Sequence, residues 1–206
     1  ADQIQAGNIS RALLLVRPPG HHSLVQRAMG FCLFNNVAIC ARYLQLLGHK
    51  KIAIVDWDVH HGNGTQDAFY EDPSVLFISL HQYPFYPGSG AASETGRGAG
   101  AGTTLNCPLP AGSADAEYKQ AFEKKILPAL EQFGPNAILI SAGFDAHRDD
   151  PLAGMLLTAT SYEWMSRKLR DFADSHCDGR LISFLEGGYN LDALADSVEA
   201  HASVLI

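Results

Sequence analysis

The stretch Ile52-Ala-Ile-Val-Asp-Trp-Asp-Val-His-His-Gly-Asn-Gly64 joins an apolar run to a cluster of acidic and imidazole side chains. The run at residues 52–56 is almost continuously hydrophobic, which is typical of a strand buried on both faces of a parallel sheet. In open parallel sheets, ligand sites lie beyond the carboxyl ends of the strands. The stretch therefore predicts an α/β fold, and it also predicts where the functional site lies.

Further short apolar runs alternate with helical patterns along the chain. The runs cover residues 12–16, 75–80, 137–141 and 181–185. Helical spacing is found at 32–47, at 116–133 with Pro128 as a break or kink, after a capping box Thr160-x-x-Glu163, and after Asn190 as a helix N-cap. Strands that alternate with helices favour a doubly wound α/β fold, an open sheet of mainly parallel strands with helices on both faces. We expect one domain over residues 1–206.

The composition excludes several classes of protein. Of the 206 residues, 47% are hydrophobic and 18% are charged, which excludes a disordered chain or a simple coiled coil. No apolar run approaches the roughly 18 residues of a membrane span, so we expect no membrane insertion. A net charge of −7 disfavours direct binding to nucleic-acid phosphates. The four cysteines form no C-x-x-C pair and are expected to be reduced, mostly buried thiols.

The polar residues after the 52–56 run have the spacing of a metal site. Side chains alternate along an extended chain, so Asp56, Asp58 and His60 face one side of it. Two carboxylates and an imidazole on one side favour a divalent cation, although a bare Asp-x-Asp is more often a solvated acidic loop. Asp145, which follows the 137–141 run, is the best candidate for a third ligand; taken alone, it could equally be a helix cap or a turn residue.

Three other features leave alternatives open. His21-His22 follows a Pro-Pro-Gly turn, and adjacent side chains of an extended chain point apart. We interpret the pair as a general base with an electrostatic helper, the alternatives being metal ligands or polar loop residues. Tyr189 is either a packed side chain or a donor to a developing oxyanion. The segment 87–102, with six glycines, is either a long surface loop or a loop that shapes the mouth of a pocket.

Taken together, six motifs resemble those of the zinc-dependent histone deacetylase superfamily, which also contains acetylpolyamine amidohydrolases and acetoin-utilisation proteins. In the family's order they are Arg17-Pro-Pro-Gly-His-His22, Gly30-Phe-Cys-Leu-Phe-Asn-Asn36, Asp56-Trp-Asp-Val-His-His-Gly-Asn-Gly-Thr-Gln66, Ser79-Leu-His81, Ser141-Ala-Gly-Phe-Asp145 with Asp150-Pro-Leu152, and Glu186-Gly-Gly-Tyr-Asn190. They cover nearly the whole chain. Asp56-Trp57, Asn63 and the segment 83–90 look like the class II and bacterial branch of the family.

The resemblance assigns a role to each matching position. The metal ligands would be Asp58, His60 and Asp145, and the catalytic residues would be His21, His22, Asp56, Asn63 and Tyr189. In that assignment Asp56 orients His21, and Tyr189 polarises the acyl carbonyl. Asn63 stands where class I members have an aspartate beside His22, and a neutral amide raises the pKa of His22 less than a carboxylate would. The metal would be Zn²⁺, with Fe²⁺ as an alternative in the cell.

The same resemblance implies a substrate channel and potassium sites. The channel would be lined by Gly30, Phe31, Tyr86, Leu152, Gly187 and Gly188. Phe31 and Tyr86 would be its two walls. A structural K⁺ would lie near Asp56, Asp58, His60, Ser79 and Leu80. A second K⁺ would lie near backbone carbonyls of residues 69–75.

The residue chemistry and the resemblance point to one reaction. Three protein ligands leave coordination positions for water and substrate, which is the catalytic rather than the structural arrangement. We expect a metal-dependent amidohydrolase that removes acetyl or other acyl groups from the ε-amine of lysine in proteins or peptides. His22 would be the general base and acid, and Tyr189 the oxyanion donor.

Three alternatives to this function differ in what they require. The enzyme could instead deacetylate acetylpolyamines or other small acylated amines. A two-metal enzyme of the arginase-like group would need a further ligand set, which the sequence does not offer. An inert acyl-lysine-binding relative would lack His22, Tyr189 or a ligand, and all of these residues are present. The sequence does not predict the oligomeric state.

The chain is short for this family. It opens at Ala1 without an initiator Met, and no secretory signal is visible. Most of what the family places before the 12–16 run is missing, including a rim loop whose aspartate often grips the substrate backbone. We therefore expect a partial catalytic domain of a cytoplasmic protein, with apolar surface exposed where further chain would pack.

Overall fold

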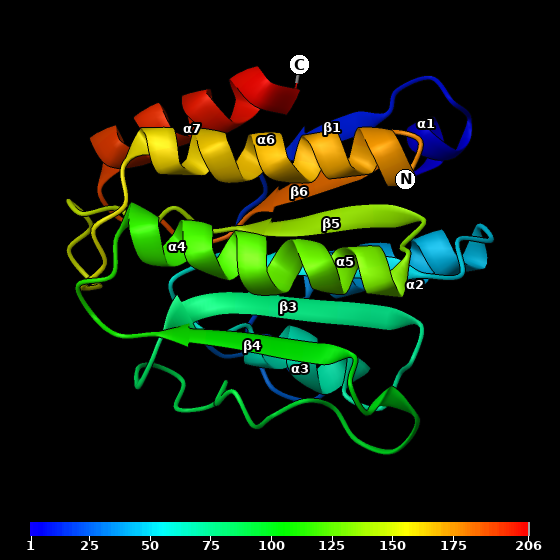
Figure 1. Cartoon of the computed structure of the whole chain (residues 1–206), viewed down its shortest axis with the longest axis horizontal. Helices are drawn as coiled ribbons and strands as arrows, with labels where there is room; N and C mark the ends of the chain where they lie inside the picture. The colour runs from blue at the N-terminus through cyan, green and yellow to red at the C-terminus, as the bar shows by residue number, and fades with distance from the viewer. Residues whose placement is uncertain (206) are drawn as a thin grey trace.

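The structure is a computed structural model that describes residues 1–205. Its strands form one sheet of six in the order β1-β6-β5-β2-β3-β4, and every neighbouring pair is parallel (Figure 1). The strands are β1 (Arg11–Leu14), β2 (Ile52–Asp56), β3 (Val75–Gln82), β4 (Thr104–Leu109), β5 (Ala137–Ala142) and β6 (Leu181–Leu185). The predicted open, parallel α/β sheet is confirmed.

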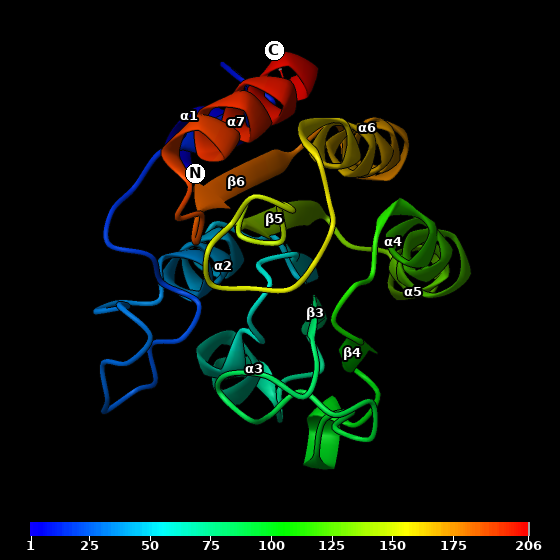
Figure 2. The same cartoon turned by 90° about the vertical axis from the view of Figure 1, so that its left-hand side faces the viewer.

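Helices cover both faces of the sheet, as predicted (Figure 2). One face carries α4 (Asp115–Ala121), α5 (Leu127–Phe133) and α6 (Ala159–His176), and the other carries α2 (Asn36–Leu46) and α3 (Asn63–Phe69). The last helix, α7 (Leu191–Leu205), packs beside α6. The shorter elements are α1 (Asp2–Gln5), the 3₁₀ turn η1 (Gly98–Gly100) and η2 (Phe122–Ile126), a π-helical segment between α4 and α5.

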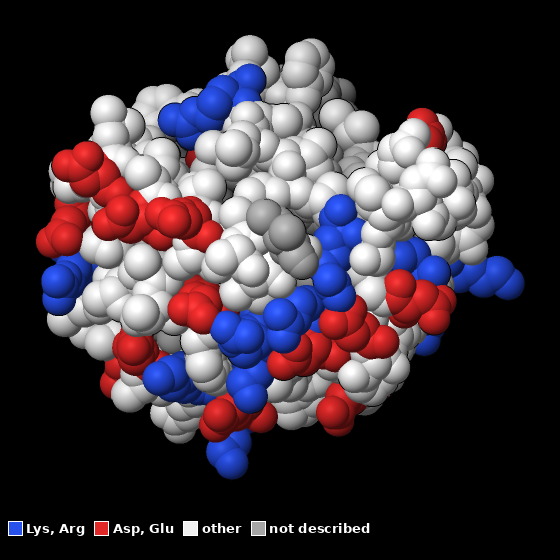
Figure 3. Space-filling model, turned by 90° about the horizontal axis from the view of Figure 1, so that it is seen from above, with Lys and Arg blue, Asp and Glu red and all other residues white. Residues whose placement is uncertain are grey.

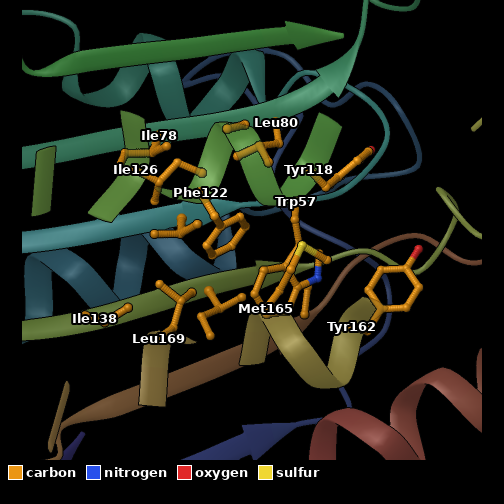
Figure 4. Close-up of a cluster of buried hydrophobic side chains, with 14 of the residues drawn as sticks. Trp57, Ile78, Leu80, Tyr118, Phe122, Ile126, Ile138, Tyr162, Met165 and Leu169 are labelled. Carbon is orange, nitrogen blue, oxygen red and sulfur yellow. The ribbon is translucent and has the colours of Figure 1, made fainter. Parts of the chain in front are cut away.

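The core consists of two apolar layers, one on each face of the sheet. Strand residues alternate between them: Val55 and Ile140 belong to the layer under α4–α6, whereas Ile54 and Leu139 belong to the layer under α2. Figure 4 shows the first layer, where side chains from these helices meet the central strands. Central strands β2, β3, β5 and β6 are buried along their whole length because helices cover both of their faces.

Two elements differ from the sequence-based prediction. The sequence pattern does not predict β4, because Asn106 and Pro108 interrupt its apolar residues; as an edge strand, it tolerates a proline. The sequence also predicts that Pro128 breaks or kinks a helix, and a break is wrong. The helical path runs from α4 through η2 into α5, and Pro128 lies in the first turn of α5, directly after the π-helical segment.

Helix caps show one correct prediction and one wrong one. The predicted capping box from Thr160 is wrong, because α6 begins at Ala159 and its N-cap is Thr158, whose N–H donates to Ser161 Oγ at 3.0 Å. The predicted N-cap of α7 is confirmed, since Asn190 Oδ1 accepts the N–H of Ala193 at 3.1 Å. In the described part of the chain the four cysteines are free thiols and three of them are buried, as expected.

The surface of the molecule mixes charges of both signs. On the face seen in Figure 3, acidic and basic side chains lie next to one another. Helix α6 carries such pairs, including Glu163 with Arg167. Among residues 1–205, no helix combines the length and the hydropathy needed to cross a membrane. A groove of about 820 Å³ lies along α2 and includes the exposed side chains of Phe34 and Leu46.

Candidate active site

The carboxyl ends of neighbouring strands bring together side chains that are far apart in the sequence. β2 ends at Asp56 and the adjacent β5 ends at Ala142, so the segments that follow carry Asp58, His60 and Asp145 to one place. One potential ligand atom from each of these three residues lies within 4.8 Å of the other two. Both carboxylates are buried and His60 is partly exposed. The three residues, called the triad below, form a candidate metal site.

Backbone groups hold the triad in place. His60 Nδ1 lies 3.0 Å from Asp58 Oδ1 and 3.1 Å from Asp145 Oδ2. The remaining oxygens accept backbone N–H groups: Asp145 Oδ1 that of Val59 at 2.9 Å, and Asp58 Oδ2 that of Gly187 at 2.8 Å. A Cβ on Gly187 would overlap both carboxylates, so this close approach of backbone to ligand requires glycine.

The electrostatics of the triad fit a divalent cation. Burial, and then the neighbouring carboxylate of Asp58, raises the pKa of Asp145 to about 7. Burial opposes charge on His60, yet its hydrogen bonds with Asp145 and Asp58 raise its pKa to about 10. Two buried carboxylates that converge on one nitrogen require positive charge between them. Zn²⁺ or Fe²⁺ would supply that charge, and a set of two oxygen ligands and one nitrogen ligand suits both ions.

His21 and His22 lie on a turn after β1, next to the triad. Their ring centroids are 4.0 Å apart, so the expectation that they point apart is wrong; the chain turns here instead of being extended. His21 Nδ1 lies 2.9 Å from Asp56 Oδ2, and His22 Nδ1 lies 2.8 Å from Asn63 Oδ1. The structure thus contains both pairings that the resemblance implies.

The two histidines differ in charge. Burial disfavours a charged His21, but the carboxylates of Asp58 and Asp56 outweigh burial and raise its pKa well above the ordinary value. Burial, and then the charge of His21, lowers the pKa of His22 to about 3. Because Asn63 presents its carbonyl oxygen, His22 Nδ1 donates that hydrogen bond and Nε2 keeps its lone pair. At neutral pH the turn therefore presents an imidazolium beside a neutral imidazole.

A pocket of about 330 Å³ opens over these groups. It is lined by His22, Gly30, Phe31, His60, Tyr86, Leu152 and Tyr189. Phe31 and Tyr86 are 72% and 44% exposed, so these aromatic walls reach the solvent, whereas His22 is buried. Tyr86 meets His22 edge to face, with ring centroids 5.1 Å apart. Four of the six predicted channel residues line this pocket.

The other predicted channel residues lie outside the pocket lining. Gly187 lies against the carboxylates of Asp58 and Asp145, and Gly188 lies close to Leu194. The residues implied for a K⁺ site are adjacent to the triad, since Ser79 on β3 pairs in register with Asp56 on β2 and Leu80 follows it. The potassium ion itself remains a prediction.

Tyr189 lies on the loop from β6 to α7 and is held through its backbone. Its N–H donates to Asp150 Oδ2 at 2.8 Å, and Asp150 Oδ1 accepts the N–H of Leu152 at 2.9 Å. Burial, and then the charges of Asp58 and Asp145, raises the pKa of the Tyr189 phenol. The phenol is therefore protonated at neutral pH and can donate a hydrogen bond into the pocket.

Sequence reasoning misses the role of two buried carboxylates, Asp150 and Glu186. Both lie within the quoted motifs, but neither is singled out there. Glu186 follows β6 and is fully buried, and its Oε2 accepts the N–H of Gly20 at 2.6 Å and of His21 at 3.2 Å. The position of Glu186 directly after a buried strand predicts that it lies at the site, as for Asp56, but does not predict which groups it bonds to.

The glycine-rich segment 87–102 does not line the pocket. It is anchored at its start, where Ser89 Oγ lies 2.8 Å from His61 Nδ1 and the carbonyl of Gly90 accepts from His81 Nε2 at 2.9 Å. Burial lowers the pKa of both histidines, to about 3 for His61 and about 4 for His81. Of the two alternatives, the structure favours a surface loop, with Tyr86 just before it at the pocket mouth.

A parallel sheet whose strand ends present an Asp-His-Asp triad, paired histidines and a tyrosine defines a class of α/β domains with a candidate divalent-metal centre. Within that class the chain belongs to the histone deacetylase domain family, whose sequence model matches residues 1–205. The resemblance drawn from the six motifs is thereby confirmed.

Named relatives agree with this assignment. The Oryza sativa subsp. japonica protein "Histone deacetylase 10, chloroplastic" is 52% identical over 185 residues, which cover 89% of this chain and 42% of that protein. The Archaeoglobus fulgidus "Probable deacetylase" is 48% identical over 181 residues, which cover 88% of this chain and 50% of that one. The crystal structure of the HDA15 HD domain matches with a TM-score of 0.95 at 47% identity, over 99% of this chain and 58% of that chain. The chain thus spans about half the length of the curated relatives that it matches.

Proposed function

We propose that this chain carries the catalytic centre of a metal-dependent deacetylase that removes acetyl or other acyl groups from the ε-amine of lysine in proteins or peptides. The observation that carries the proposal is the arrangement of the triad, the His22–Asn63 pair and Tyr189 around one pocket. Membership of the histone deacetylase domain family supports a deacetylase reaction in general.

The triad would hold the metal, which we propose is Zn²⁺ or, in the cell, Fe²⁺. When bound, the ion supplies a Lewis acid for the acyl carbonyl and acidifies a water molecule. The protein contributes fixed ligand oxygens, since Asp58 and Asp145 are each held by a backbone N–H. Hydrogen bonds from the backbone to a ligating carboxylate orient that ligand before the metal binds.

His22 is the group that moves the proton. With Nδ1 donating to Asn63, the free Nε2 accepts the proton of the attacking water and later returns it to the leaving amine. The carboxylates of Asp58 and Asp56 raise the pKa of His21, so that His21 places positive charge beside the negative charge that develops on the substrate.

Tyr189 and the pocket walls act on the acyl chain. The protonated phenol of Tyr189 donates to the carbonyl oxygen as it becomes an oxyanion. Phe31 and Tyr86 provide apolar aromatic surfaces on the way to the triad, and such surfaces suit the unbranched methylene chain of an acylated lysine. An acylated lysine peptide or a small acylated amine is therefore the partner that we expect.

Finer expectations belong to the same proposal. The in-register pairing of Ser79 with Asp56 supports a structural K⁺ beside the triad. Asn63 and Tyr86 support the class II and bacterial branch. A cytoplasmic location is proposed from the sequence alone; one relative named above carries the word chloroplastic in its own name.

The test is metal-dependent acetate release. The protein is stripped with a chelator, reloaded with Zn²⁺, and assayed with an Nε-acetyl-lysine peptide and with N-acetylputrescine. We expect release only from the loaded protein, with a higher kcat/KM for the peptide. A preference for N-acetylputrescine would assign small acylated amines as substrates. A folded, metal-loaded protein that binds a hydroxamate but releases acetate from neither substrate would contradict the proposal and favour an inert acyl-lysine-binding protein.

A further inference from the structure

The turn that carries His21 and His22 is neither helix nor strand, so its position depends on contacts with other segments. It follows β1, whose neighbour in the sheet is β6. Because parallel strands end at the same edge of the sheet, the turn lies beside the first residue after β6. That residue is Glu186.

Glu186 holds the turn through both its backbone and its side chain. Its carbonyl oxygen accepts Arg17 Nη1 at 2.9 Å. Its carboxylate Oε2 accepts the N–H of Gly20 at 2.6 Å and of His21 at 3.2 Å. Its other carboxylate oxygen accepts Ser141 Oγ, on β5, at 3.1 Å. One buried side chain thus links the ends of three adjacent strands, β1, β6 and β5.

A buried carboxylate is costly, and its hydrogen bonds to backbone N–H groups offset that cost only when the geometry is kept. Glu186 lies outside the residues that line the pocket, so a substrate in the pocket would not touch it. Its effect on chemistry must pass through the histidine turn.

We propose that Glu186 is a positioning residue for the two histidines: its carboxylate fixes the Gly20–His21 backbone so that the His22 ring stands between Asn63 and the pocket. The consequence for turnover rests on the proposed deacetylase function. The contact itself does not, and it can be measured separately. This role requires a side chain long enough to bring its oxygen to the N–H groups of Gly20 and His21, and a negative charge alone does not meet that requirement.

Two substitutions separate reach from charge. In Glu186→Gln the side chain keeps its length, its carbonyl oxygen can accept both N–H groups, and its amide can donate to Ser141 Oγ. In Glu186→Asp the charge stays, but the carboxylate moves away from the turn by one methylene. Ser183→Ala is the matched control: Ser183 is equally buried on β6, but it bonds to His201 Nε2 at 2.8 Å and not to the turn.

The first measurement is amide hydrogen exchange of Gly20 and His21 by NMR in the metal-loaded protein. We expect exchange about tenfold faster in Glu186→Asp and near the wild-type rate in Glu186→Gln and Ser183→Ala. Unchanged exchange in Glu186→Asp, or equally fast exchange in Glu186→Gln, would overturn the positioning role.

The second measurement is turnover of the acetyl-lysine peptide. We expect kcat to fall by about 10- to 100-fold in Glu186→Asp, because misplacement of about 1 Å has effects of this size. KM and bound metal should stay at the wild-type level, and Glu186→Gln should retain kcat within about threefold. A Gln variant as slow as the Asp variant would refute the proposal. If the wild type itself releases no acetate but the exchange pattern is as expected, the proposed function fails and the positioning role stands.

Discussion

The floor and the walls of the pocket are built in different ways. The floor, defined here as the triad of Asp58, His60 and Asp145, lies within four residues of the ends of neighbouring buried strands, and its carboxylates are buried. The walls, defined as Phe31, Tyr86, Leu152 and Tyr189, lie on connecting loops. Three of them, Phe31, Tyr86 and Leu152, are 72%, 44% and 49% exposed.

This difference separates two tasks. The floor takes its geometry from sheet topology, because parallel strands deliver their carboxyl ends to one edge. The walls take theirs from contacts between loops, such as the hydrogen bonds of Asp150 to the backbones of Leu152 and Tyr189. Substitutions in the floor should therefore change metal binding, and substitutions in the walls should change catalysis or substrate affinity with the metal still bound.

The largest effect is expected for Asp145→Ala. Removing a ligand should lower metal affinity by more than the roughly 10- to 100-fold typical of substitutions at residues that only hydrogen-bond to a ligand, and deacetylation should be lost with the metal. The N–H of Val59 would also lose its acceptor. Asp145→Asn, which keeps an oxygen for Val59, distinguishes loss of a ligand from loss of folding.

Metal content after dialysis against a limiting Zn²⁺ buffer is the measurement for both Asp145 variants. The wall substitution Leu152→Ala should retain the wild-type amount and serves as the control. Wild-type metal content in Asp145→Ala would show that the floor is not the metal site. The assignment of metal binding to the floor and of catalysis and substrate affinity to the walls would then be wrong.

The next effect is expected for Tyr189→Phe. Loss of one oxyanion donor should reduce kcat by about 10²- to 10³-fold. Metal content and thermal stability should not change, because within residues 1–205 the backbone of Tyr189, and not its hydroxyl, makes the hydrogen bond that holds it. Steady-state kinetics together with metal analysis test this. Full activity in Tyr189→Phe would show that the Tyr189 hydroxyl takes no part in the reaction. Loss of metal would show that Tyr189 contributes to metal binding, as the floor does.

A smaller effect is expected for Asp150→Asn. The amide can accept one of the two N–H groups that Asp150 now accepts, so either Tyr189 or Leu152 loses its anchor. We expect kcat to fall by about tenfold, less than removal of the hydroxyl itself, with metal content unchanged. Asp149→Asn, at the exposed neighbouring position, is the control and should behave as wild type. Equal losses in both variants would argue against a specific role for Asp150.

The contrast between floor and walls also explains what the sequence could predict. The apolar run before Asp56 marks a strand end, and strand ends converge, so local pattern and topology predict that Asp58, His60 and Asp145 lie close together. Only the family resemblance excludes Asp56 from the predicted ligands. No local pattern shows that Phe31 and Tyr86 meet across a pocket, and only the family resemblance suggests it. The expectation for His21 and His22 fails because it assumes an extended chain, whereas contacts with Glu186 and Asn63 fold that segment into a turn.

The smallest effect is expected at the pocket mouth, for Phe31→Ala. Phe31 adopts a left-handed backbone conformation with φ of 65°, and alanine bears a Cβ as phenylalanine does, so the substitution removes the wall without adding backbone strain. Loss of contact with about one or two substrate methylenes corresponds to roughly 1 kcal/mol, or about a fivefold higher KM. The kcat should stay within about twofold because the floor is untouched. Tyr86→Phe, which removes a hydroxyl and keeps the ring, should change neither constant. A large fall in kcat for Phe31→Ala would mean that the mouth positions the reacting groups, and that the walls and the floor act as one unit.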